Sequence, residues 1–106
     1  MPEQTSSWGT TTSWTFLSNH TQVFLCIAAE PEVRMRDIAL RVGITERAVQ
    51  RIIAELEADR YITITREGRR NRYTVVPERP LRHPMQSHRT LAHLIELGLG
   101  GKSKRK

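Results

Sequence analysis

Residues 37–76, which decide the fold, read DIALRVGITERAVQRIIAELEADRYITITREGRRNRYTVV. Apolar residues recur at helical spacing on both sides of Gly43, and two segments of alternating apolar residues lie on either side of Gly68. Gly43 supplies a left-handed residue without steric cost, and Gly68 marks a turn. The stretch therefore predicts two helices that meet at a tight turn, followed by an antiparallel β-hairpin.

The first of these helices is expected at about residues 36–42, with Leu40 partly covered. Its buried stripe is Ile38, Ala39 and Val42. The second is expected to be capped by Thr45 and to run to about Asp59. Its apolar face, pressed against a core, consists of Ala48, Val49, Ile52, Ile53 and Leu56. The opposite face is polar and free to meet a groove: Glu46, Arg47, Gln50, Arg51, Ala54 and Glu55.

The hairpin strands are expected at residues 61–65 and 72–76, in a register that the sequence leaves open. The candidate inward contacts are Tyr61, Ile62, Ile64, Tyr73 and Val75. Four guanidinium groups surround the glycine of the turn: Arg66, Arg69, Arg70 and Arg72. Their mutual repulsion is costly unless solvent or a polyanion relieves it, which points to phosphates or a narrow minor groove.

The segment before this stretch predicts a central core helix that begins at Ser18 or Asn19 and ends near Ala29, before Pro31. Residues 33–35 are expected to form a brief strand or a turn. Trp14 and Phe16 could pack back on the core helix. Residues 1–13 have no periodic apolar face, and we expect a flexible N-terminal segment there.

The segment after the hairpin predicts a proline-punctuated linker and an amphipathic helix at about residues 85–99, which Gly100 and Gly101 stop. This helix could lie on the core helix of its own chain or pair with a second copy, and we favour the second copy. The expected dimer contacts are Leu91, Leu94 and Ile95. Residues 101–106 are expected to be a disordered basic tail.

The amino-acid composition limits the binding partners and the cellular compartment that can be expected. Lys and Arg number 17 against 11 Asp and Glu, which gives a net charge of +6 and a pI near 10.4 and favours a polyanionic partner. The single cysteine, Cys26, makes no intramolecular disulfide and favours a reducing cytoplasm. We expect it to be a buried, inert thiol rather than a redox sensor. No apolar run reaches the roughly 20 residues needed to span a bilayer, and no secretory signal is expected.

Catalytic and metal chemistry find little support in the sequence. The chain has four histidines, and the spacing of five residues between His83, His88 and His93 does not place their rings on one helical face. We therefore expect no metal. No phosphate-binding glycine loop, paired carboxylates or activated nucleophile is evident, so we expect neither an enzyme nor a cofactor.

The order of elements resembles the winged helix-turn-helix of prokaryotic transcriptional regulators, close to the MarR and ArsR groups. The resemblance covers about residues 19–76 and is carried by residues 36–53, 56–57, 61–62 and 66–73. It implies a mainly α fold with a small β-hairpin (α+β) and an additional C-terminal helix. The expected division is a DNA-binding domain at residues 14–79 and a linker with a dimerisation helix at residues 80–100.

The resemblance implies a cytoplasmic, nucleoid-associated homodimer that reads a palindromic site in double-stranded DNA. The second helix of the motif would lie in the major groove and the basic hairpin on the minor groove or backbone. The expected helix contacts are Thr45, Glu46, Arg47, Gln50 and Arg51. The expected hairpin contacts are Arg66, Arg69, Arg70, Asn71 and Arg72, with Asn71 better explained as a turn residue. No effector can be named.

Four alternatives stay open. The polar helix face could be an ordinary solvated surface stabilised by neighbouring charges, and the basic hairpin could serve solubility alone. The fold could also serve as an adaptor that binds proteins. Finally, the basic tail is compatible with non-specific coating of DNA.

Overall fold

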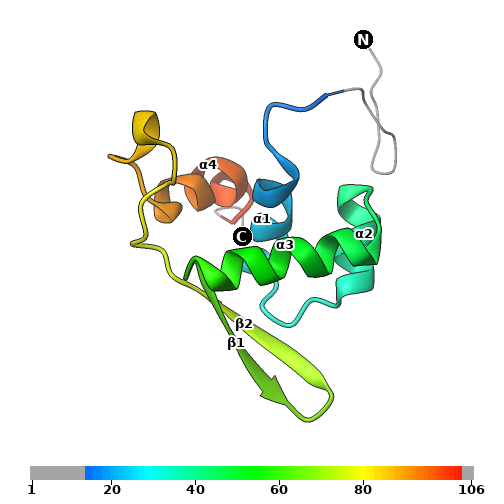
Figure 1. Ribbon diagram of the computed structural model, residues 1–106. Coiled ribbons are helices and arrows are strands. Elements are labelled where there is room, and N and C mark those ends of the chain that lie inside the picture. The colour runs from blue at the N-terminus through cyan, green and yellow to red at the C-terminus, as the bar shows by residue number, and fades with distance from the viewer. Residues whose placement is uncertain (1–13, 104–106) are drawn as a thin grey trace.

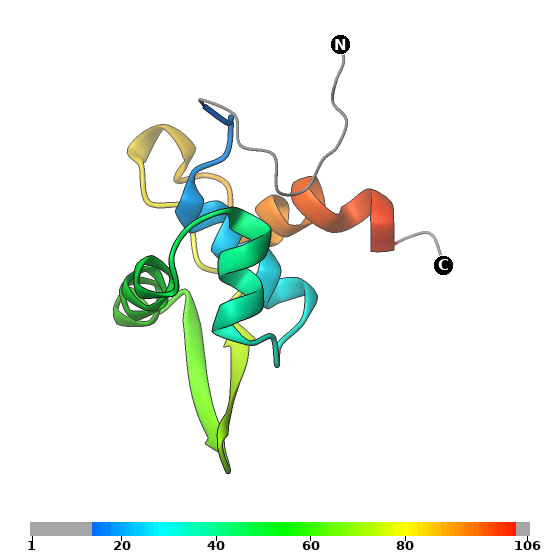
Figure 2. The ribbon, with the colours of Figure 1, turned by 90° about the vertical axis from the view of Figure 1, so that its right-hand side faces the viewer.

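Three helices form the body of the protein, a hairpin projects from one side of them, and a fourth helix lies on the opposite side (Figures 1 and 2). The computed structural model describes residues 14–103. The helices of the body are α1 (Asn19–Ala29), α2 (Met35–Val42) and α3 (Glu46–Ala58). The hairpin consists of β1 (Ile62–Glu67) and β2 (Arg70–Val75), and the fourth helix is α4 (Leu91–Ser103). The predicted α+β winged helix-turn-helix with a C-terminal helix is thus confirmed.

The core is built around α1, which contributes Val23, Phe24, Leu25 and Ile27 as buried residues. From α2, α3 and the hairpin come the other fully buried large side chains: Ile38, Val49, Ile52 and Ile62. Burying a side chain of this size contributes roughly 1.5–3 kcal/mol relative to exposure. These contacts fix α3 and the hairpin against the same helix.

The helix boundaries follow local capping. Ser18 caps α1 by accepting a hydrogen bond from the Thr21 amide, and Thr45 caps α3 by accepting one from the Ala48 amide at 3.0 Å. Gly43, with φ of 85°, ends α2 in the left-handed conformation. The predicted ends of α1 and α3 are therefore confirmed to within one residue.

Three sequence expectations about exposure and local structure were wrong in whole or in part. Leu40 is 70 % exposed, because it lies on the face of α2 opposite to Ile38. Of the two alternatives for residues 33–35, a strand or a turn, the strand is contradicted, since α2 already begins at Met35. Trp14 and Phe16 stack edge to face with centroids 4.8 Å apart but are exposed rather than packed on α1.

The hairpin pairs Ile62 with Val75 and Glu67 with Arg70, which leaves a two-residue loop. The first loop residue, Gly68, has φ of 65°, as a tight hairpin turn of this length requires. The strands reach further toward the turn than predicted. The predicted inward contacts are buried or half-buried: Tyr61, Ile62, Ile64, Tyr73 and Val75.

The C-terminal helix differs most from its prediction. Residues 84–86 form a separate 3₁₀ turn, and α4 begins only at Leu91. Its first two backbone amides donate hydrogen bonds to the linker. Leu91 N–H donates to the Arg79 carbonyl and Ala92 N–H to the Pro77 carbonyl, each at 2.9 Å. The helix also continues past Gly100 to Ser103, because glycine weakens a helix by only about 1 kcal/mol and does not by itself end one.

The C-terminal helix packs on α1 of its own chain, which is the arrangement that the sequence left as the less favoured alternative. No helix in residues 14–103 is long and apolar enough to cross a membrane. The predicted disordered tail at residues 101–106 was wrong for residues 101–103, which belong to α4. Its remainder at residues 104–106 and the predicted flexible segment at residues 1–13 lie outside the described residues.

Candidate nucleic-acid interface

The outward face of α3 carries the residues predicted to contact DNA. Glu46, Arg47, Gln50 and Arg51 are all exposed, while Val49, Ile52 and Ile53 bury the opposite face in the core. Thr45, also exposed, serves as the N-cap. The helix is therefore held by its apolar face and presents two guanidinium groups and an amide to solvent. Side chains of these types can form paired hydrogen bonds with guanine and adenine edges.

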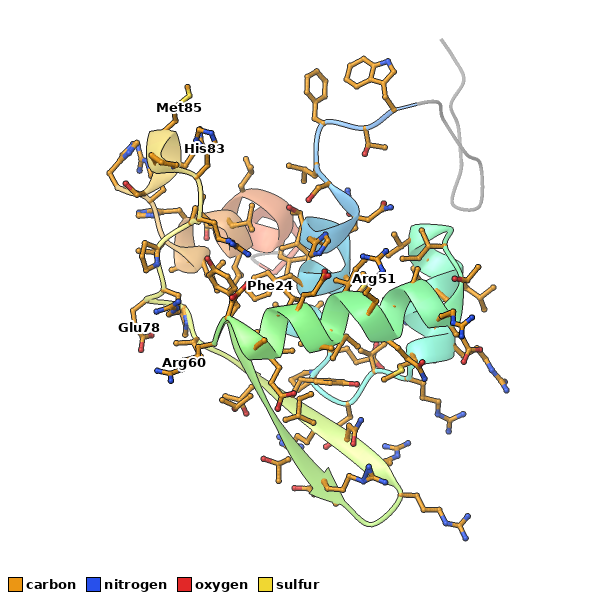
Figure 3. The ribbon with its side chains drawn as sticks, viewed as in Figure 1. Phe24, Arg51, Arg60, Glu78, His83 and Met85 are labelled. Atoms are coloured by element: carbon orange, nitrogen blue, oxygen red, sulfur yellow. The ribbon has the colours of Figure 1, made fainter. Side chains whose placement is uncertain are left out.

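Within this face the two arginines differ in their surroundings. The guanidinium of Arg51, labelled in Figure 3, lies 3.7 Å from the carboxylate of Glu55, four residues further along α3. Arg47 has no ion pair within residues 14–103. The alternative of an ordinary solvated helix face, stabilised by neighbouring charges, thus fits Arg51 but not Arg47.

The carboxylate of Glu55 also contacts α1. Its Oε1 lies 2.6 Å from Nε2 of His20. This hydrogen bond, with the nearby guanidinium of Arg51, lowers the pKa of Glu55 from its ordinary value of 4.5. Glu55 thereby connects the first turn of α1 to an arginine on the exposed face of α3.

The structure divides the four hairpin arginines into two pairs. Arg70 and Arg72 lie two residues apart on β2 and therefore on one face of it, and both form ion pairs with Glu32. Arg66 and Arg69 are exposed and have no ion pair in the described part of the chain. The expectation that Asn71 is a turn residue was wrong, because it lies within β2, paired with Arg66, and is half-buried. Repulsion between the hairpin arginines is thus partly relieved by Glu32 of the protein itself. On the sequence alone, a polyanion or solvent was expected to relieve it.

The loop between α1 and α2, which carries Glu32, runs beside β2. The amide of Tyr73 donates a hydrogen bond to the Pro31 carbonyl at 2.9 Å, and Val33 is buried in the core. An open hollow of about 430 Å³ lies between this loop and β2. Its lining is entirely polar except for one proline: Glu30, Pro31, Glu32, Arg34, Asp37, Arg70 and Arg72.

Sequence reasoning missed Glu32 and His20 as parts of this surface. Both lie far along the chain from the residues that they contact: Glu32 is separated from Arg70 by 38 residues and His20 from Glu55 by 35. The acidic pair around Pro31 was read only as a helix end. No local sequence pattern predicts such contacts, because they depend on how α1 and the hairpin pack.

The predicted dimer contacts are partly used within the chain. Leu91 is 5 % exposed, and Leu94 and Ile95 are half-buried against the core. Leu97, on the same helix, is 72 % exposed. A role of these residues in binding a second copy stays a prediction, and the buried Leu91 contributes to the core of its own chain.

Two further sequence expectations concern the thiol and metal binding. Cys26 is half-buried rather than fully buried, and burial raises the pKa of its thiol, an effect that nearby Arg41 partly offsets. The thiol is therefore protonated and weakly nucleophilic at neutral pH. Among residues 14–103, no three His, Cys, Asp or Glu side chains are grouped as a metal site.

Comparison with known proteins gives two findings. A family model described as the MarR family matches residues 15–72. The crystal structure of the PcaV transcriptional regulator from Streptomyces coelicolor, in complex with its natural ligand, is similar in fold, with a TM-score of 0.52 and 20 % sequence identity. The match covers 80 % of this chain and 62 % of the PcaV chain. Among proteins with curated descriptions, none matches the sequence.

Proposed function

Because the chain belongs to the MarR family of transcriptional regulators, we propose that it binds double-stranded DNA and recognises a specific sequence through α3. Arg47, Gln50 and Arg51 read base edges in the major groove, while Thr45 and Glu46 lie at the N-terminal end of the same helix. The observation that carries the proposal is the exposed face of α3, which is held from behind by the core and carries Arg47, a residue with no ion pair among the described residues.

The hairpin supplies the second contact. Arg66 and Arg69 lie at the turn between β1 and β2 and have no ion pair in residues 14–103. The hairpin that carries them projects from the helical body (Figure 1). They bind phosphates or enter a narrow minor groove beside the site that α3 occupies. Arg70, Asn71 and Arg72 lie further back on β2, where internal contacts compete for the two arginines.

We further propose that two copies bind a palindromic site. The exposed side of α4, with Leu97 and the half-buried Leu94 and Ile95, would contribute to the contact between copies. A two-fold protein places its two recognition helices in successive major grooves, about 34 Å apart. Such a regulator works in the cytoplasm, at the chromosome. The chain spans only 62 % of the length of PcaV, so assembly and effector binding of that protein are not carried over.

The test is selection from a random-sequence duplex library at near-physiological salt. A palindrome with half-sites about one helical turn apart supports a dimeric, sequence-specific regulator. Recovery of unselected DNA contradicts sequence recognition and supports non-specific binding, whereas recovery of no DNA supports a protein-binding adaptor. The controls are the same selection with Arg47→Ala and with Arg89→Ala, which removes an equal charge from the linker.

A further inference from the structure

One carboxylate in the loop between α1 and α2 holds two arginines of the hairpin. Glu32 Oε1 lies 3.4 Å from Nη1 of Arg70, and its Oε2 accepts a hydrogen bond from Nη1 of Arg72. The two guanidinium groups come from one face of β2 and converge on this carboxylate. Two positively charged guanidinium groups therefore share the single negative charge of one carboxylate.

The backbone holds Glu32 in place while its partners are long and flexible. The bond from the Tyr73 amide to the Pro31 carbonyl joins the loop to the edge of β2, and buried Val33 anchors the next position. The arginine side chains are about half exposed, at 54 % for Arg70 and 47 % for Arg72. Ion pairs with such exposure are screened by water and contribute little to stability, so an outside anion can displace the carboxylate.

A DNA phosphate is an anion of the required kind. Guanidinium groups bind phosphate and carboxylate oxygens by the same charge-assisted hydrogen bonds. The other acids lining the hollow do not take Glu32's place: Glu30 is paired with Arg41 at 3.3 Å, and Asp37 has no ion pair within residues 14–103. Glu32 is thus the acid that holds these two arginines in the free protein.

We propose that Glu32 is an internal competitor of the DNA phosphates for Arg70 and Arg72, and so limits the strength of the hairpin's contact with DNA. The inference rests on the proposed function. In the free protein the carboxylate keeps both arginines turned toward the α1–α2 loop. When DNA binds, a phosphate replaces the Glu32 carboxylate, and the cost of breaking the two internal ion pairs reduces the favourable electrostatic free energy of binding.

The test is Glu32→Gln, which keeps the size of the side chain and removes its charge. Affinity for any duplex should rise on the order of tenfold at moderate salt. The slope of log affinity against log salt should change little, because Arg70 and Arg72 neutralise the same phosphates in both complexes. The matched control is Glu78→Gln, which removes the same charge from the exposed linker position labelled in Figure 3.

A second comparison isolates the two arginines. In a protein that carries Arg70→Ala and Arg72→Ala, Glu32→Gln should change affinity no more than Glu78→Gln does, because nothing remains to be released. The inference is overturned if Glu32→Gln weakens binding, or if it matches Glu78→Gln in the parent protein. Failure of the parent protein to bind DNA even at low salt overturns the proposed function as well, so the two failures are distinguishable.

Discussion

His20 Nε2 lies 2.6 Å from Glu55 Oε1, and the same oxygen lies 3.7 Å from the guanidinium of Arg51. The first turn of α1 and a proposed base-reading arginine therefore share one carboxylate. Because this longer contact is the one ion pair of Arg51 within residues 14–103, Arg51 can leave Glu55 without breaking the bond between α1 and α3.

The first prediction concerns pH. The hydrogen bond from His20 and the charge of Arg51 lower the pKa of Glu55 from 4.5 in the folded protein. A lowered carboxyl pKa contributes stability that is present above the unfolded value and is lost as pH falls through the folded value. Glu55→Gln should therefore be less stable than the parent protein at about pH 6, and the difference should shrink as the pH falls below 4.5. Urea unfolding measures the difference, and a difference that does not change over this range contradicts the prediction.

The second prediction concerns the hairpin. Replacing Arg66 and Arg69 with Ala should lower affinity for all duplexes by a similar factor and reduce the salt slope by about 1.8, since two phosphate contacts are lost. Titrations at several salt concentrations measure both quantities. Arg89→Ala serves as the charge control. A loss confined to one sequence would assign these arginines to base recognition instead.

The third prediction concerns the docking of α4. A Cβ atom at Gly98 would lie 2.5 Å from Cδ1 of Leu25, a side chain that is only 7 % exposed and has little room to move. Gly98→Ala should therefore destabilise the protein by about 1–2 kcal/mol, despite the better helix propensity of alanine. Urea unfolding measures the change.

The control for this prediction is Gly100→Ala, whose Cβ would have the flexible carboxylate end of Glu96 as its nearest neighbour. That substitution should be neutral or stabilising by up to about 1 kcal/mol. Equal effects of the two substitutions would show that α4 does not approach Leu25 closely.

The fourth prediction concerns the end of α3. Arg60 has φ of 67°, a left-handed conformation that residues with a Cβ rarely adopt. Arg60→Gly should stabilise the protein by about 1 kcal/mol by relieving this strain. Arg60→Ala removes the same charge but retains the Cβ and should give no such gain. If the two variants are equally stable, the strain is absent.

The elements that the sequence predicted well depend on neighbours in the chain. Thr45 caps the amide three residues away, and Gly43 ends α2 through its own backbone conformation, so both helix boundaries are visible in a short window. The alternation of strand residues likewise identified the hairpin. Its register was fixed only by the two-residue turn at Gly68.

The features that the sequence could not predict depend on distant partners. The start of α4 is set by carbonyls of Pro77 and Arg79 in the linker, and its path along α1 requires the small Gly98 beside Leu25. In the candidate site, the face of α3 was predictable from helical periodicity. The division of the hairpin arginines into two pairs was not predictable, because it depends on Glu32, which lies 38 residues before Arg70 in the sequence.

Recognition of base sequence by α3 is tested most directly by the ratio of affinities for the selected duplex and a scrambled one. The parent protein should prefer the selected duplex by at least roughly 10³. In Arg47→Ala with Arg51→Ala this ratio should fall by about ten- to a hundredfold or more, while the unfolding free energy changes little. A folded variant that keeps the full preference, or a parent protein that has none, would contradict sequence recognition by α3.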